Sequence, residues 1–307
     1  MNSTTDHSMT SHWSSLCGGQ EQVQGRHSVI SSYAAILVLT LTGITATIIN
    51  SFLLYIMATN SHFRTPSGIL VSFMAFTDLL TGCVSIPTYV ANQVAVVRSI
   101  TPSCPLYILY KTSTVILLTI TILLLAALSF DRYLLAGKGT KKPNWKLKRI
   151  YKVIFLTIWI ITLAAVIPAF LDSSYRKAAQ ALGLLIGIFA TACITFSHIN
   201  VFLSLRARRR ILPGRSIHPL TDFRIKWLRK SVNTLIIIIV MFVLCFTPRS
   251  IYIILSLVSG ETAADKALEV WSVVSLLMNS AITPAIYIHR SRNIRLIIRR
   301  HGRVVAH

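Results

Sequence analysis

Seven long stretches of this chain contain almost no charged side chains. A membrane-spanning helix needs about 20 mostly apolar residues, and each stretch meets that length. They cover residues 34–58, 65–97 (with Asp78 as the single charge), 112–130, 153–171, 178–205, 231–257 (with Arg249) and 270–289. Strands of a membrane barrel would alternate apolar with polar residues over about ten positions, and these stretches do not. Because backbone groups in hydrocarbon must be satisfied within their own segment, the sequence predicts an all-α membrane protein with a seven-transmembrane helix bundle.

The basic residues are concentrated on one side of this predicted bundle. Lys and Arg outnumber Asp and Glu by 31 to 9, and most lie around Arg64 and in residues 138–152, 206–230 and 290–303. Since cytoplasmic loops carry the Lys and Arg excess, we expect an extracellular N-terminus and a cytoplasmic C-terminus. Membrane lipids are an expected partner. Nucleic acid is not, because the charge is divided among four short segments that flank the membrane.

The expected organisation has three parts. Residues 1–31 form an extracellular tail, residues 32–290 form the bundle, and residues 291–307 form a cytoplasmic amphipathic helix and tail. The last part mixes basic with apolar residues, which is typical of a helix on a membrane surface. Asn2-Ser3-Thr4 fits a glycosylation signal on the outer tail. With 13% charged residues and a mean hydropathy of +0.64, the chain falls well below the roughly 25% charge of soluble domains.

Polar and unusual residues inside the stretches or at their ends follow a distinctive order, and within a span such residues are functional candidates because hydrocarbon makes them costly. In chain order they are Asn50; Arg64-Thr65-Pro66; Asp78; Asp131-Arg132-Tyr133; Trp159 and Pro168; Phe242, Cys245, Phe246 and Pro248; and Asn279, Ser280, Pro284 and Tyr287. In this order the sequence resembles the rhodopsin-like family of G protein-coupled receptors over residues 30–300. It departs from the family pattern at Phe246, which replaces a tryptophan, and at Thr283, which replaces an asparagine.

The resemblance implies a receptor in the plasma membrane, not an enzyme, that binds an extracellular ligand and activates a heterotrimeric G protein. It implies that Asp131, Arg132 and Tyr133 form an activation switch, in which Tyr287 turns inward beside Pro284. The alternative is that Arg132 merely extends to the membrane interface. A transporter is the competing function class, but we find no convincing internal repeat of the kind expected for one.

Phe242 and Phe246 lie one helical turn apart, just before Pro248. Proline removes a helix hydrogen bond and permits a kink, so this pair is predicted to act as a moving joint. The alternative is a plain apolar core contact.

Asp78 is the only acidic residue deep in a span, and a buried carboxylate needs a partner. Side chains of Thr121, Asn279, Ser280 and Thr283, with Asn50 nearby, are expected to surround it. The resemblance implies a sodium ion at this position, and no other metal or cofactor is expected. The alternative is a hydrogen-bond network without an ion.

Arg249 and Lys111 are candidates to bind an acidic group of the receptor's ligand, because a cation inside a span needs a partner. Thr114 and Glu269 are the other ligand-binding candidates. The alternative is that Arg249 forms an internal salt bridge with Glu269 or Asp172. Family members that bind amines have an acid where Thr114 stands, and those that bind retinal have a lysine where Leu277 stands. We therefore do not expect a light receptor or a simple amine receptor.

The family usually has a disulfide between the third span and the second outer loop, and that loop has no cysteine here. The resemblance thus places Cys104 near the usual position without its usual partner. A Cys17–Cys104 bridge is the remaining candidate on the oxidising outer face.

Overall fold

The computed structural model describes residues 26–98, 100, 103–136, 144–171, 176–211, 219–259, 265–291 and 294–298. Within these residues, seven spans are long and apolar enough to cross a membrane. They are Ile30–Thr59, Pro66–Val97, Cys104–Ala136, Lys146–Ile167, Ala181–Ser204, Arg229–Val258 and Ala267–Arg290. The predicted all-α fold with seven membrane spans is confirmed.

The helices follow one another with short connections. They are α2 (Arg26–Thr59), η1 (Ser61–Phe63), α3 (Pro66–Leu80), η2 (Thr81–Ser85), α4 (Ile86–Val97), α5 (Cys104–Ala136), α6 (Asn144–Leu171), α7 (Arg176–Ile211), α8 (Pro219–Ser259) and α9 (Asp265–Arg290). The first helix therefore begins inside the tail expected for residues 1–31. Of the expected C-terminal helix, residues 294–298 are helical, with Ile294 buried in the core; residues 299–307 lie outside the described part.

The second span is interrupted by one wide helical turn. It starts with a capped helix, because the Thr65 side chain accepts a hydrogen bond from the Gly68 amide and Pro66 occupies the first helical position. The five residues of η2 form a π-helix. Pro87 explains this turn: it has no N–H for the carbonyl of Cys83, and its ring crowds that carbonyl. The hydrophobic pattern of the span does not predict this π-helix.

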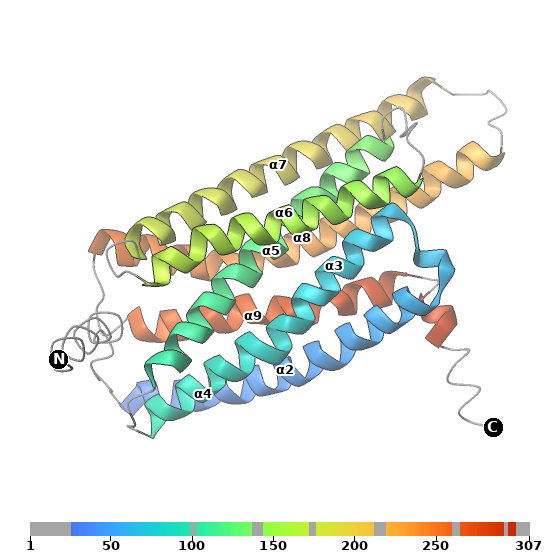
Figure 1. Cartoon of the computed structure of the whole chain (residues 1–307). Coiled ribbons are helices and arrows are strands. Elements are labelled where there is room, and N and C mark those ends of the chain that lie inside the picture. Colours follow the sequence, from blue (N-terminus) through green and yellow to red (C-terminus); the bar gives the residue numbers. More distant parts are fainter. Residues whose placement is uncertain are drawn as a thin grey trace, which may run out of the picture.

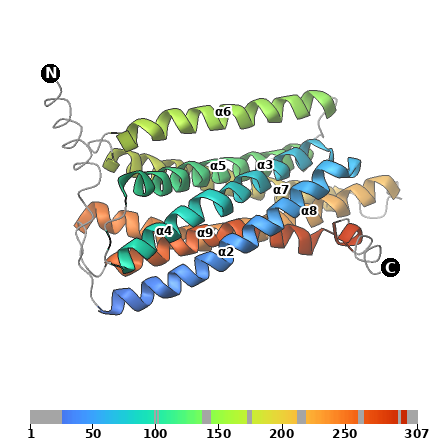
Figure 2. The same ribbon diagram turned by 60° about the horizontal axis from the view of Figure 1, so that its bottom comes forward.

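The bundle is arranged around α5. Buried residues of α5 recur every four positions, at Ile116, Ile120, Leu124 and Leu128, and belong to the main core. α6 lies at the periphery and packs mainly on α5 and α3 (Figure 2). α2 and α9 pack side by side and run in the same direction along the bundle (Figure 1).

The two ends of the bundle differ in charge. We call the end that carries Arg64, Arg132, Arg149, Lys152 and Arg290 the basic end; α2, α5 and α9 finish there. The other end, where these helices begin, is called the opposite end. Figure 1 shows α7 and α8 projecting past the other helices at the basic end.

Candidate functional site

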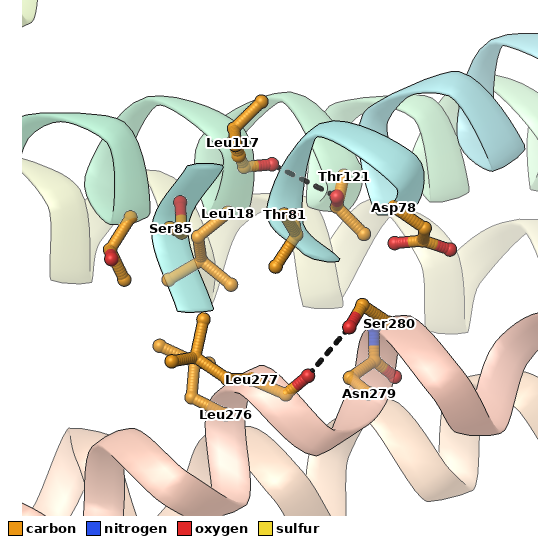
Figure 3. Close-up of a pocket in the computed structure, with 11 residues that line it drawn as sticks. Asp78, Thr81, Ser85, Leu117, Leu118, Thr121, Leu276, Leu277, Asn279 and Ser280 are labelled. Atoms are coloured by element: carbon orange, nitrogen blue, oxygen red, sulfur yellow. Dashed lines mark hydrogen bonds between the residues drawn. The ribbon is translucent and has the colours of Figure 1, made fainter. Parts of the chain in front are cut away.

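A small cavity lies inside the bundle between the second span, α5 and α9 (Figure 3). Its volume of about 20 Å³ is enough for roughly one water-sized particle. The lining combines polar and apolar side chains: Asp78, Thr81, Ser85, Thr114, Leu117, Leu118, Thr121, Leu276, Leu277, Asn279 and Ser280. The structure thus brings Thr121, Asn279 and Ser280 to Asp78, as expected from the sequence.

The carboxylate of Asp78 is the unusual group in this cavity. Asp78 is only 2% exposed, and its Oδ2 atom is buried without a hydrogen-bond partner. Figure 3 shows it facing Asn279 and Ser280 across the gap to α9. A buried acceptor left unsatisfied costs about 1–3 kcal/mol, and more if it is charged. The site therefore holds a buried carboxyl oxygen that has no hydrogen-bond partner among the described residues.

The hydroxyl groups around Asp78 do not donate to it. Thr81 donates to the carbonyl of Thr77, Thr121 donates to that of Leu117, and Ser280 donates to that of Leu277. Because a hydroxyl has one proton and two lone pairs, each of these oxygens still has acceptor capacity. A carboxylate among such oxygens suits a hard cation, which prefers oxygen ligands.

Asn50 and Thr283 stand behind the cavity rather than in its wall. The Asn50 amide donates to the carbonyls of Ala46 and Ser280, at 2.9 and 3.0 Å, and thereby ties α2 to α9. Thr283 donates to Oδ1 of Asn279 at 3.3 Å. Both residues hold cavity-lining residues in place. Among the described residues, no group of three or more His, Cys, Asp and Glu side chains could hold a metal ion.

At the basic end, Asp131 is held by two helices other than its own. Ser67 of α3 donates to its Oδ2 atom at 2.8 Å, and the Tyr151 hydroxyl of α6 donates to its Oδ1 atom. Arg132 forms an ion pair with Oδ2 at 3.8 Å. The sequence identified the neighbouring arginine but missed Ser67 and Tyr151. Only the rotation of α3 and α6 in the bundle reveals these two donors.

Arg132 is buried at the basic end, with 5% exposure. Tyr287 of α9 lies within electrostatic range of both Arg132 and Asp131. Tyr133 points elsewhere and packs on a small cluster of Ala136, Val201 and Val232. The predicted switch residues Asp131, Arg132 and Tyr287 therefore lie near one another, while Tyr133 joins the contact with α7 and α8.

Phe242 and Phe246 form a stacked pair on α8, with ring centroids 5.8 Å apart and an interplanar angle of 15°. Phe242 is buried in the core. Gly187 of α7 leaves room for the other ring, because a Cβ atom there would lie 3.1 Å from the Phe246 ring. α8 continues through Pro248, and α9 continues through the buried Pro284.

Charged and aromatic side chains form a cluster at the opposite end. Lys111 of α5 makes an ion pair with Glu269 of α9 at 3.7 Å, and its ammonium lies 5.1 Å from the centre of the Tyr107 ring. Tyr110 packs edge-on against both Tyr107 and Tyr89. The Lys111–Glu269 ion pair thus joins α5 to α9, next to a cluster of three tyrosine rings.

Arg249 does not form the salt bridge with Glu269 that was one of the alternatives suggested by the sequence. Its guanidinium donates to the Ser272 hydroxyl at 3.5 Å and lies 4.9 Å from the centre of the Tyr252 ring. Asp172, the other proposed partner, lies outside the described residues. Among the described side chains, Arg249 therefore contacts a hydroxyl and an aromatic ring and makes no salt bridge.

Thr114 lies between the Asp78 cavity and the charged cluster around Lys111. It was predicted to bind ligand with Lys111, but it lines the Asp78 cavity, and its hydroxyl is buried without a hydrogen-bond partner. Leu277 lines the same cavity. The wall of the Asp78 cavity therefore reaches to within one helical turn of Lys111.

The cysteines divide into two groups. Cys104 is disulfide-bonded, whereas Cys83, Cys193 and Cys245 are free. The predicted partner Cys17 and the predicted glycosylation site Asn2 lie outside the described residues, so both assignments remain predictions.

In the part of the chain that the structure describes, seven helices long and apolar enough to cross a membrane surround a small, partly polar cavity, and a buried Asp-Arg pair lies at one end of the bundle. The sequence model named "7 transmembrane receptor (rhodopsin family)" matches residues 49–287. This chain therefore belongs to the rhodopsin family of seven-transmembrane receptors, as the sequence motifs predicted, a family of receptors rather than enzymes.

Two relatives and one solved structure illustrate the similarity. The chain is 25% identical to melanopsin of Rattus norvegicus and 24% identical to melanopsin of Mus musculus, each over 240 residues. These alignments cover 69% of this chain and 50% and 45% of the relatives, so the chain spans about half their length. The crystal structure of squid rhodopsin matches with a TM-score of 0.73 at 17% identity, over 96% of this chain and 89% of that one.

Proposed function

We propose that this receptor binds an extracellular ligand at the opposite end of its bundle and activates a heterotrimeric G protein at its basic end. The distribution of basic residues supports this orientation, since Lys and Arg mark cytoplasmic loops. The burial of Arg132 beside Asp131 and Tyr287 supports a switch at the cytosolic face. A ligand acts by binding the active arrangement more tightly than the resting one.

The ligand is proposed to carry an acidic group such as a carboxylate or phosphate. The observation that carries this proposal is the charge balance of the opposite-end cluster. Lys111 takes the carboxylate of Glu269, and Arg249 has no carboxylate among the described side chains. A guanidinium binds carboxylate and phosphate through two parallel hydrogen bonds, so Arg249 is the proposed anchor.

Two positions argue against other ligand classes. Thr114 supplies no acid for an amine and lines the Asp78 cavity. Leu277 is buried where retinal-binding family members have lysine. Neither residue type supports an amine or retinal as the ligand.

We also propose that the Asp78 cavity holds one sodium ion. The unpartnered Oδ2 atom of Asp78 supports this, as do the lone pairs of Thr121 and Ser280. A bound cation would neutralise the buried carboxylate and join the second span to α5 and α9.

The ligand proposal is tested in cells that report activation of each class of G protein. Acidic small molecules are screened on the wild-type chain, and any active compound is then titrated on Arg249→Gln. Loss of a buried charge pair costs about 2–5 kcal/mol, so potency should fall roughly 30-fold or more. The matched control is Arg98→Gln, which removes an exposed arginine from the same end and should leave potency unchanged. Unchanged potency of Arg249→Gln at equal surface expression would refute the anchor.

A further inference from the structure

A second and much larger hollow lies on the outside of the bundle, between α5, α6 and α7. This groove has a volume of about 660 Å³ and is lined by Leu123 of α5, by residues 153–161 of α6 and by residues 185–189 of α7. Thr157 is the only polar residue in its lining. Its rims are open, since Val153 is 55% exposed and Leu185 is 62% exposed.

The groove faces hydrocarbon rather than water. The lining residues of α5, α6 and α7 all fall within the membrane-spanning windows of those helices. α6 and α7 meet only sparsely, since α6 packs mainly on α5 and α3 (Figure 2). A lipid chain can therefore enter sideways between the two helices. Lipid tails are as apolar as leucine, however, so the apolar wall alone gives no preference among lipids.

A preference for one headgroup comes from the basic end of α6. The groove residues 153, 154, 157, 158 and 161 are three or four positions apart and so share one helical face. Continued toward the basic end, this face reaches Ile150 and Lys146, and Arg149 lies at its edge, one turn from Val153. With a rise of 1.5 Å per residue, Arg149 lies about 6 Å and Lys146 about 10 Å beyond Val153. Both basic side chains are exposed.

The other two lysines of this segment point away from the groove. At 100° per residue, Lys148 and Lys152 lie on the reverse side of α6 from the groove-lining residues. Of the four basic residues at positions 146–152, only Arg149 and Lys146 therefore lie toward the groove side of α6. Basic side chains commonly extend along apolar surface to place their charge at the membrane interface.

We propose that this groove is a binding site for one anionic phospholipid, with an acyl chain between α6 and α7 and its phosphate-bearing headgroup on Arg149 and Lys146. The site rests on the proposed orientation, because anionic lipids are concentrated in the cytoplasmic leaflet. Binding of the lipid itself requires neither the ligand nor the G protein.

The test is native mass spectrometry of the purified protein, exchanged against equal amounts of phosphatidylserine and phosphatidylcholine with identical acyl chains. The wild-type chain should retain phosphatidylserine at least threefold over phosphatidylcholine. Lys146→Gln/Arg149→Gln should reduce the ratio to near one. The matched control, Lys148→Gln/Lys152→Gln, removes the same net charge from the reverse side of α6 and should keep the wild-type ratio.

A second variant tests the groove. Thr157→Trp together with Leu185→Trp adds bulk at exposed positions, and thermal unfolding checks that it folds. This variant should lose at least half of the retained phosphatidylserine. The proposal is overturned if both charge variants lose the preference equally, if the wild-type chain shows no preference, or if retention survives the filled groove. Because no receptor activity is measured, failure of the proposed signalling function would leave this result unaffected.

Discussion

Asp131 shows how a single carboxylate joins three helices at the basic end. Its two oxygens accept hydrogen bonds from Ser67 and Tyr151, and the charged partner Arg132 is farther away, at 3.8 Å. A hydrogen bond to a charged group contributes about 1.5–3 kcal/mol, whereas an ion pair at that distance keeps little directional preference. The position of Asp131 is therefore set more by α3 and α6 than by Arg132.

Tyr151→Phe should lower the free energy of unfolding by about 1.5–3 kcal/mol, because it leaves a buried carboxylate oxygen without its donor. Thermal unfolding of the purified protein measures the change. Tyr133→Phe is the matched control, since the Tyr133 hydroxyl makes no hydrogen bond within the described residues. Equal stability of the two variants would show that Tyr151 does not hold Asp131.

The contacts around Asp131 show which site residues can be predicted from the sequence and which cannot. The adjacent residues Asp131, Arg132 and Tyr133 could be recognised together because they are contiguous. Tyr151 could not be assigned, because the face of α6 that meets α5 depends on packing rather than on local pattern. For the same reason the sequence left Glu269 as a possible partner of Arg249, whereas in the structure Glu269 pairs with Lys111.

Sodium should stabilise the protein through Asp78. A ligand at ten times its dissociation constant adds roughly 1.4 kcal/mol of stability, so replacing potassium with sodium at constant ionic strength should raise the unfolding temperature. Asp78→Asn removes the charge with little change of shape and should abolish the difference between the two salts. A variant that still distinguished sodium from potassium would exclude this site.

The second span packs very closely against α2. Its η2 turn approaches α2 so closely that a Cβ atom on Gly82 would lie 2.8 Å from the Thr47 hydroxyl and 3.2 Å from the Gly43 carbonyl. Small residues at such crossings let membrane helices pack backbone to backbone. The position of Asp78, four residues before Gly82, depends on this contact.

Gly82→Val should destabilise the protein, because overpacking a tight contact costs about 1–3 kcal/mol. Gly183→Ala is the control: nothing lies within 4 Å of a Cβ atom there, and alanine favours a helix over glycine by up to about 1 kcal/mol. Unfolding temperatures of the two variants should move in opposite directions. A tolerated Gly82→Val would contradict the close approach of η2 to α2.

At this scale the sequence predicts the existence of every span but not its internal shape. Charge-free length is sufficient to identify a helix in hydrocarbon, since no other open structure satisfies the backbone there. The π-helix at Thr81–Ser85 follows from how Pro87 and the packed Gly82 are accommodated together. Similarly, the sparse contact of α6 with α7, and hence the lipid groove, arises only when the helices are assembled.

Across the whole molecule, α5 is the element common to every proposed site. It carries Lys111 at the opposite end, Thr121 beside Asp78 and Arg132 at the basic end. The 21 positions from Lys111 to Arg132 correspond to about 31 Å of helix, close to the hydrocarbon thickness of a bilayer. A shift of α5 against α9 therefore acts on the proposed ligand, sodium and G protein sites together.

The basic end is proposed to activate a heterotrimeric G protein through Arg132. The most direct measurement is GDP–GTP exchange on purified heterotrimers by the protein reconstituted in lipid bilayers, without other cell components. The wild-type chain should accelerate exchange on at least one heterotrimer. Arg132→Ala should abolish this acceleration, whereas Arg64→Ala, at an exposed arginine of the same end, should retain it. Equal acceleration by Arg132→Ala, or none by the wild-type chain with any heterotrimer, would contradict the account.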